Sequence, residues 1–248
     1  MRTNRRKIRD EISSMCKKIS FSQSIVSLCE DKANAREEAF LHLALTTEIE
    51  NRIESRKARL LKEAGFPVYK TLKGYDLKNL KLPPQLKFQD LTSGAFIRNK
   101  QNVVLFGPVG TGKTHLASAI GIAACAMDIP VRFYTVAELV VRLSEASRSG
   151  SIDRLMKSIL KADLIIFDEW GYVPVDKQGA QWLFRIIADS YERRSLVITT
   201  NLEFSKWGTV LTDDQMAAAI IDRIAHYGHL VMFDGDSHRM RNALMKQK

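Results

Sequence analysis

The sequence has few cysteines, no long hydrophobic run and no leader-like start. Cys16, Cys29 and Cys125 are odd in number and lack the spacing of metal ligands, so we expect reduced, unpaired thiols. No apolar run approaches the roughly 18 residues of a membrane span. The basic N-terminus is not followed by an apolar stretch, which argues against a secretory signal. These absences exclude a disulfide scaffold and a membrane span, and we expect a cytoplasmic protein.

The positive charge is concentrated in the first part of the chain. The 248 residues are 45% hydrophobic and 27% charged, which leaves room for one α/β domain and a small accessory domain. Residues 1–100 hold 21 Lys and Arg against 12 Asp and Glu, a balance of +9, whereas residues 101–248 hold 17 against 16, a balance of +1. A partner made of phosphates is the physical expectation for such a field, although the charge also promotes solubility alone.

Residues 107–114 match the pattern G-x-x-x-x-G-K-[ST]. In this pattern successive backbone N–H groups surround the phosphates, the lysine reaches the β- and γ-phosphates, and the hydroxyl binds Mg²⁺. A strand before the loop and a helix after it place a helix N-terminus behind the phosphates. The segment therefore predicts a nucleoside triphosphate site. Its expected nucleotide contacts are Gly107, Pro108, Val109, Gly110, Thr111, Gly112, Lys113, Thr114 and His115.

From residue 102 onward, short apolar runs alternate with amphipathic stretches. The predicted strands are Asn102–Phe106, Val131–Val136, Asp163–Phe167, Ser195–Thr199 and Leu230–Phe233. The predicted helices are His115–Met127, Ala137–Ser147, Ile152–Leu160, Gln178–Arg193 and Asp214–His226. This alternation predicts an α/β fold with a parallel sheet covered by helices on both faces. Because ligands bind at the carboxyl ends of such strands, the residues that end each strand matter most.

The start of the chain has the periodicity of helices. We expect helices over residues 2–20, 21–30 and 34–64, and then a connector over residues 68–101. The expected buried residues are Ile8, Ile12, Met15 and Ile19, then Phe21, Ile25, Val26 and Leu28, and then Phe40, Leu43, Leu45, Ile49, Ile53, Leu60 and Leu61. The predicted domains are therefore a helical one at 1–67 and a nucleotide-binding one at 68–248.

Basic residues on the first and third of these helices are candidates for contacts to DNA phosphates. They are Arg2, Arg5, Arg6 and Lys7 near the start, and Arg56 and Lys57 further along. An exposed chain end explains the first group nearly as well, and a solvated helix face is the ordinary explanation of the second.

Two carboxylates follow the buried run that ends at Phe167. Asp168 is placed to hold Mg²⁺ together with Thr114, and Glu169 is placed to polarise an attacking water. A kinase that acts on a small molecule has less need of the second acid. With Lys113, the pair therefore predicts hydrolysis of the triphosphate.

Asn201 is a further catalytic candidate, because it follows the strand that begins at Ser195. Its amide is expected to orient the lytic water or to contact the γ-phosphate. Thr200 is the alternative, and an asparagine at a strand end often only caps a turn.

Arg223 is the last catalytic candidate. A guanidinium aimed at the γ-phosphate neutralises developing charge and accelerates hydrolysis by orders of magnitude. If a neighbouring copy supplies it, the copies pack head to tail into rings or filaments. An ion pair with Asp222 or Asp214 is the competing explanation. Weaker candidates are Arg193, Arg194, Arg239 and Arg241.

Together these motifs resemble the AAA+ ATPases, and more narrowly the IstB family of insertion-sequence helper proteins, which are relatives of the DnaC-type helicase loaders. The similarity extends from about residue 56 to residue 242. Its segments are Ala64–Pro67, Lys70–Leu72, Gly107–Ala117, Asp168–Tyr172, Tyr191–Ser195, Thr199–Asn201, Trp207, Asp222–Ile224, His226 and Gly235–Arg239. Trp170 and His238 depart from the family's usual aliphatic residue and tyrosine, which puts only local packing in doubt.

The resemblance implies an AAA+ P-loop three-layer sandwich that uses ATP and Mg²⁺, preceded by a small all-helical domain. It implies an ATP-dependent helper of a transposase that assembles on double-stranded DNA, bends it, selects the target and stimulates transposition. It also implies that the helices after the second strand face nucleic acid. The candidate contacts there are Arg142, Arg148, Arg154 and Lys157.

Three other functions are compatible with the same core motifs. A replicative helicase loader would act on single-stranded DNA and would not assemble on duplex DNA in response to ATP. A small-molecule kinase would transfer phosphate to an acceptor other than water, without stimulation by DNA. A nucleotide-binding switch without turnover would be indifferent to the replacement of Glu169.

Overall fold

The computed structural model describes residues 2–73, 75 and 77–238, with side chains from residue 5 onward. Its contacts divide the chain into two compact units, Met1–Arg59 and Leu60–Lys248. The division falls within the long helix α3 (Ala35–Ala64), a few residues before the boundary predicted at residue 67. Each unit has its own core.

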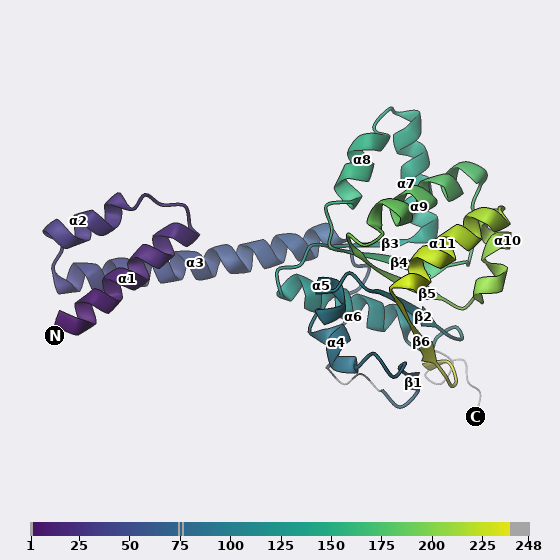
Figure 1. The fold of residues 1–248 in the computed structure, drawn as a ribbon, viewed down its shortest axis with the longest axis horizontal. Coiled ribbons are helices and arrows are strands. Elements are labelled where there is room, and N and C mark those ends of the chain that lie inside the picture. Colours follow the sequence, from purple (N-terminus) through teal and green to yellow (C-terminus); the bar gives the residue numbers. More distant parts are fainter. Residues whose placement is uncertain (1, 74, 76, 239–248) are drawn as a thin grey trace, which may run out of the picture. The chain divides into compact units, whose positions relative to one another are not determined.

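The first unit consists of α1 (Arg2–Lys18), α2 (Ser24–Lys32) and the larger part of α3 (Figure 1). The three predicted helices are therefore confirmed. Ile12, Met15 and Cys16 of α1 form the core with Ile19, which directly follows α1, and with Leu45 of α3.

The predicted buried faces of this unit were too wide. Phe40 and Leu43 are 73% and 62% exposed, and Phe21, Leu28 and Ile53 are exposed as well. The core of this unit takes only one stripe of α3, centred on Leu45. The apolar residues elsewhere on the circumference of the helix remain in contact with water.

Glu38 is an acid buried completely in the first unit. Arg5 donates to it from Nε and Nη2, at 2.9 and 2.8 Å, and Arg9 donates from Nε at 2.7 Å. Hydrogen bonds from the Arg5 guanidinium are the main reason why the pKa of Glu38 falls from 4.5 to about 2. Arg5, predicted as a DNA contact, is thus occupied in holding α1 to α3.

The second unit is built on a six-stranded sheet in the order β1-β6-β2-β5-β4-β3. The strands are β1 (Leu80–Lys81), β2 (Asn102–Phe106), β3 (Val131–Thr135), β4 (Leu164–Trp170), β5 (Ser195–Thr200) and β6 (Gly228–Phe233). All are parallel except β1, which pairs with β6 in the antiparallel sense. The predicted parallel sheet is therefore confirmed, with one short antiparallel strand added at its edge.

Helices cover both faces of this sheet and make three layers (Figure 1). One face carries α7 (Val136–Arg148), α8 (Ile152–Ile159), α9 (Lys177–Ser190), α10 (Trp207–Leu211) and α11 (Asp214–His226). The other carries α4 (Phe88–Thr92), α5 (Ala95–Arg98) and α6 (Lys113–Ala126). Each of the two helical layers packs against the sheet through its own apolar core. One core lies around Leu139 and Leu183 and the other around Leu116 and Phe96.

Several short elements were not predicted, namely β1, α4, α5, α10 and the 3₁₀ turn η1 (Phe204–Lys206). Strands β4 and β5 also extend further than expected, to Trp170 and Thr200. In the described part of the chain, no helix has both the length and the apolar content to cross a bilayer.

Candidate nucleotide-binding site

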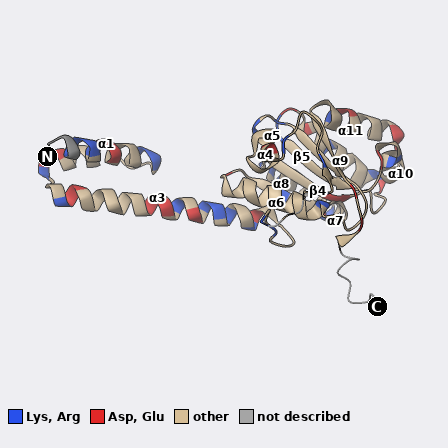
Figure 2. Cartoon of the chain, turned by 90° about the horizontal axis from the view of Figure 1, so that it is seen from below, with Lys and Arg blue, Asp and Glu red and all other residues tan. Residues whose placement is uncertain are grey.

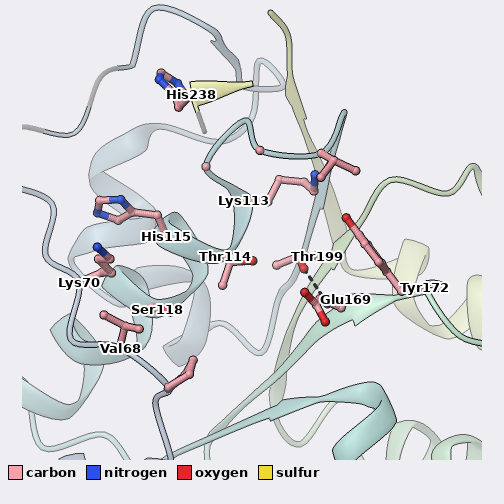
Figure 3. A pocket seen from close by; sticks show the side chains of 14 residues that line it. Val68, Lys70, Lys113, Thr114, His115, Ser118, Glu169, Tyr172, Thr199 and His238 are labelled. Carbon is pink, nitrogen blue, oxygen red and sulfur yellow. Dashed lines mark hydrogen bonds between the residues drawn. The ribbon is translucent and has the colours of Figure 1, made fainter. Parts of the chain in front are cut away.

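A cavity of about 530 Å³ lies in the second unit, around the loop 107–114. This volume is within the range of small-molecule sites. The lining comes from the loop, from β4 and β5 where they end, and from segments before α4 and after β6 (Figure 3). The lining residues are Pro67, Val68, Lys70, Val109, Gly110, Gly112, Lys113, Thr114, His115, Ser118, Glu169, Tyr172, Thr199 and His238.

The loop reaches its shape through glycines in the left-handed region. Gly110 and Gly112 have φ values of +80° and +101°, which residues with a Cβ adopt only with strain. Gly112 directly precedes α6, so the N-terminus of this helix faces the cavity. The buried ammonium of Lys113 donates to the carbonyl oxygens of Gly107 and Pro108, at 2.7 and 2.6 Å. The loop thus holds the positively charged lysine side chain at the predicted phosphate site.

Asp168 lies buried at the centre of a hydroxyl network. Its Oδ1 accepts a hydrogen bond from Thr114 Oγ1 at 2.9 Å and another from Thr199 Oγ1. Burial raises the pKa of Asp168, and the two threonine hydroxyls and a backbone contact at Glu169 oppose that rise. The carboxylate and the hydroxyl predicted to share a metal ion therefore meet, although they come from β4 and α6.

Glu169 is the exposed neighbour of Asp168 and lines the cavity. Its φ of +60° is unusual for a residue with a side chain, and the pairing of β4 with β5 is irregular between Phe167 and Trp170. The Glu169 N–H donates to Thr199 Oγ1 at 3.0 Å, which holds the turned backbone (Figure 3). This irregularity in β4 directs the Glu169 side chain into the cavity.

The structure does not bring Asn201 or Thr200 into this cavity. Asn201 is exposed in a bend beyond β5, and Thr200 Oγ1 donates to the Trp170 carbonyl at 2.8 Å. The hydroxyl that lines the cavity belongs to Thr199. Alternation along β5 explains why Thr199 lines the cavity and Thr200 does not, because adjacent residues point to opposite sides. Asn201 is excluded because it lies beyond the end of the strand.

The far end of the cavity is formed by Val68, Lys70, His115 and His238, away from Glu169 (Figure 3). His115 Nε2 lies 2.9 Å from the Thr71 carbonyl oxygen, which ties α6 to the connector. The His238 N–H donates to the Gly110 carbonyl at 2.9 Å and ties the segment after β6 to the loop.

Arg223 is not among the residues that line this cavity. It lies near the end of α11, where Nη1 donates to the Ala219 carbonyl at 2.7 Å and the guanidinium carbon lies 5.3 Å from the Phe184 ring centroid. In the described part of the chain, it makes no ion pair with Asp222 or Asp214. Arg194 donates to the carbonyls of Leu160 and Asp189, Arg193 is exposed, and Arg239 and Arg241 lie outside the described residues.

The residues present fit a magnesium ion. Thr114 Oγ1 and Asp168 Oδ1 lie 2.9 Å apart, and hydroxyl and carboxylate oxygens are the donors that Mg²⁺ prefers. A buried carboxylate whose pKa is raised also gains from a neighbouring cation.

The predicted DNA contacts of the second unit differ in their surroundings. Arg142 is bound to Glu138 and lies over the Tyr134 ring. Arg148 donates to the Ser144 carbonyl at 3.4 Å and remains exposed at the end of α7. Arg154 and Lys157 are exposed three residues apart on α8 and share one side of it.

The predicted contacts of the first unit also differ. Arg6 and Lys7 are exposed on α1, and the side chain of Arg2 lies outside the described residues. Lys57 pairs with Glu54 at 2.9 Å. Arg56 lines a shallow groove together with Arg52 and Arg59, on a stretch of α3 where acidic and basic residues alternate (Figure 2).

The chain is similar to curated proteins of bacterial insertion sequences. It is 33% identical over 224 residues to the insertion sequence IS21 putative ATP-binding protein of Pseudomonas aeruginosa, covering 89% of this chain and 84% of that one. It is 31% identical over 229 residues to the IS232 putative ATP-binding protein of Bacillus thuringiensis subsp. berliner, covering 92% and 85%.

Solved structures share the fold at lower identity. The DnaC helicase loader superposes with a TM-score of 0.53 at 20% identity, over 66% of this chain and 96% of that one. AMPPCP-bound DnaA from Aquifex aeolicus gives a TM-score of 0.55 at 21% identity, over 71% and 53%. The second unit thus has the AAA+ fold, and the family model described as "IstB-like ATP binding protein" matches residues 17–246. The chain therefore belongs to the family of IstB-like ATP-binding proteins.

Proposed function

We propose that this protein hydrolyses ATP and, through nucleotide-dependent self-assembly on duplex DNA, bends a target and stimulates a partner transposase. The observation that carries the proposal is the convergence of Lys113, Thr114, Glu169 and Thr199 on one cavity, with the buried Asp168 hydrogen-bonded to both threonines. The cavity contains the groups for binding and cleaving a triphosphate, while the arginine expected to complete it lies elsewhere on the surface.

In the proposed reaction, the loop N–H groups and Lys113 bind the β- and γ-phosphates, and Glu169 accepts a proton from the attacking water. The water oxygen forms a bond to the γ-phosphorus, and the β–γ bridging oxygen leaves with ADP. Thr199 holds the Glu169 backbone and Asp168 in register. Thr114 and Asp168 would hold Mg²⁺, which would supply charge neutralisation to the phosphates when bound.

Assembly is supported by the surface around the cavity. Tyr69, Val173, Val68, Val109 and Tyr172 are exposed, and the last three also line the cavity. An apolar rim of this kind is typical of a surface that a partner covers. A second copy that brings Arg223 to this rim would supply the missing guanidinium, and head-to-tail repetition would produce a ring or a filament.

The DNA and transposase parts of the proposal are supported by the relatives and by charge. The similar curated proteins are named for insertion sequences, and the first 100 residues carry the positive balance of the chain. Duplex DNA resists bending at a cost of several kcal/mol. Many weak phosphate contacts, one set per copy, are a physical means of meeting that cost without reading sequence.

A helicase loader is the second candidate, favoured by the similarity to the DnaC helicase loader. The two functions differ in the DNA that drives assembly. Electron microscopy of the protein with duplex and single-stranded DNA, with and without ATP, distinguishes them. ATP-dependent assemblies on bent duplex support the transposition helper, whereas assembly on single strands alone supports the loader.

Hydrolysis is tested by Glu169→Gln, which keeps the shape of the side chain and removes its basicity. We expect ATP turnover to fall at least about 100-fold, the usual contribution of a general base, while ATP binding and assembly persist. Lys113→Ala is the comparison variant and should lose ATP binding itself. Unchanged phosphate release in Glu169→Gln would mean that Glu169 is not the catalytic base. It would favour a nucleotide-binding switch, in which the measured phosphate release does not depend on this residue.

A further inference from the structure

Arg223 is held differently from the three arginines of the described second unit that lie beside carboxylates. Arg132 pairs with Glu63, Arg142 with Glu138, and Arg185 lies beside Asp153 and Asp189. Arg142 and Arg185 also lie over aromatic rings, those of Tyr134 and Trp182. Among the described residues, Arg223 has no carboxylate partner and is held by one carbonyl of its own helix and by the ring of Phe184 on α9.

This arrangement suits an arginine whose guanidinium interacts with a phosphate bound to another copy of the protein. A carboxylate would compete with a phosphate for the guanidinium, whereas a ring restricts the side chain and leaves its N–H groups largely free. Arg223 is half-buried and directed by contacts from two helices that pack together. The ring therefore limits the rotamers of a long side chain without neutralising its charge.

We propose that Phe184 is the positioning residue for Arg223. Its ring holds the guanidinium in the orientation in which it binds the γ-phosphate of a neighbouring copy. This inference rests on the proposed function, in which Arg223 serves the site of the next subunit. Phe184 contacts no nucleotide in this scheme, since it is not among the residues that line the cavity. Its effect appears only in the site to which its own chain donates the arginine.

Mixed assemblies isolate this effect. A Lys113→Ala copy donates Arg223 but binds no ATP, and an Arg223→Ala copy binds ATP but donates no arginine. Turnover in the mixture arises only where the first copy faces the site of the second. The donor is then prepared as Lys113→Ala alone, with Phe184→Leu, and with Phe184→Tyr.

We expect the Phe184→Leu donor to recover about fivefold less kcat than the Lys113→Ala donor, as for the loss of one exposed cation–π contact. The KM for ATP should not change, because the recipient's site is intact. The Phe184→Tyr donor should restore the rate, since it keeps the ring. The matched control is Phe184→Leu in the Arg223→Ala recipient, where no arginine remains to be held.

The outcomes separate this inference from the function on which it rests. Full recovery with the Phe184→Leu donor would overturn the positioning role and leave the shared site standing. Equal losses with Phe184→Leu in donor and recipient would show a merely structural role and would also overturn it. No recovery with the unmodified Lys113→Ala donor at any mixing ratio would overturn the shared site itself.

Discussion

Thr199 connects the two acids of the site through one hydroxyl group. It donates to Asp168 and accepts from the N–H of Glu169, so it acts on the proposed metal ligand and on the proposed base together. The hydroxyl also compensates for the left-handed backbone at Glu169, a conformation that costs about 1–2 kcal/mol. A side chain without the hydroxyl would leave both acids less restrained.

We therefore expect Thr199→Ala to lower kcat for ATP by about tenfold, as for the loss of a charge-assisted hydrogen bond of about 1.5 kcal/mol. Thr199→Ser keeps the oxygen and should retain most of the rate. Steady-state turnover with ATP affinity measured in parallel checks both variants. A Thr199→Ala enzyme with the normal rate would contradict this role of Thr199.

Glu38 gives the first unit a predictable response to acid. A carboxyl whose folded pKa is lowered from 4.5 to about 2 stabilises the fold fully above pH 4.5, and this contribution declines as the pH falls toward 2. Glu38→Gln should remove the contribution and weaken the unit by about 2 kcal/mol at pH 7, as expected for charged hydrogen bonds.

Hydrogen exchange of the α1 amides measures this locally, with the sheet of the second unit as the internal control. In the unmodified chain, α1 protection should decline between pH 4.5 and 3 beyond the intrinsic pH dependence of exchange. In Glu38→Gln it should already be reduced at pH 7 and change little in that window. Equal α1 protection in the two proteins at pH 7 would contradict the assignment.

At the scale of elements, the long helices and buried strands were predictable, and the short elements were not. Strand β2 and helix α11 have the predicted bounds. A continuous apolar run followed by a glycine marks β2, and apolar periodicity after the Asp213 cap marks α11. Helices α5 and α10 have only four and five residues, too few for a periodic pattern to emerge. Their apolar residues are instead buried by tertiary packing, as Phe96 and Trp207 show.

Helix α8 carries the simplest prediction about DNA, because Arg154 and Lys157 are exposed together on it. Replacing both by alanine should weaken binding to duplex DNA of any sequence. The slope of log K against log salt should decrease by about two, one for each lost phosphate contact. Lys177→Ala with Lys206→Ala removes the same charge from other exposed positions and should leave the slope nearly unchanged. Equal effects of the two pairs would mean that only net charge matters.

At the scale of the molecule, the candidate nucleotide-binding site could be predicted more completely than the surfaces. The short sequence of the phosphate loop fixes one backbone shape, so Lys113 and Thr114 line the same cavity and Thr114 lies within hydrogen-bonding distance of Asp168. The apolar residues of α3 follow no such constraint. Periodicity identified Leu45 and Phe40 alike, and only the packing of the short helices decided that the first is buried and the second exposed.

The apolar rim of the cavity leads to the last prediction, which concerns the assembly as a whole. Val173 is 54% exposed beside the cavity but does not line it, so a charge there should oppose docking of a second copy without disturbing ATP. We expect Val173→Asp to raise the protein concentration needed for ATP-dependent self-association by about tenfold, as for a desolvated charge costing at least 1.4 kcal/mol. Val141 on α7 is 56% exposed, and Val141→Asp is the matched control that should assemble normally. Light scattering in ATP with duplex DNA compares the two, and ATP titration confirms that both still bind nucleotide. If Val173→Asp assembles as readily as the control, the rim is not the surface on which the next copy docks.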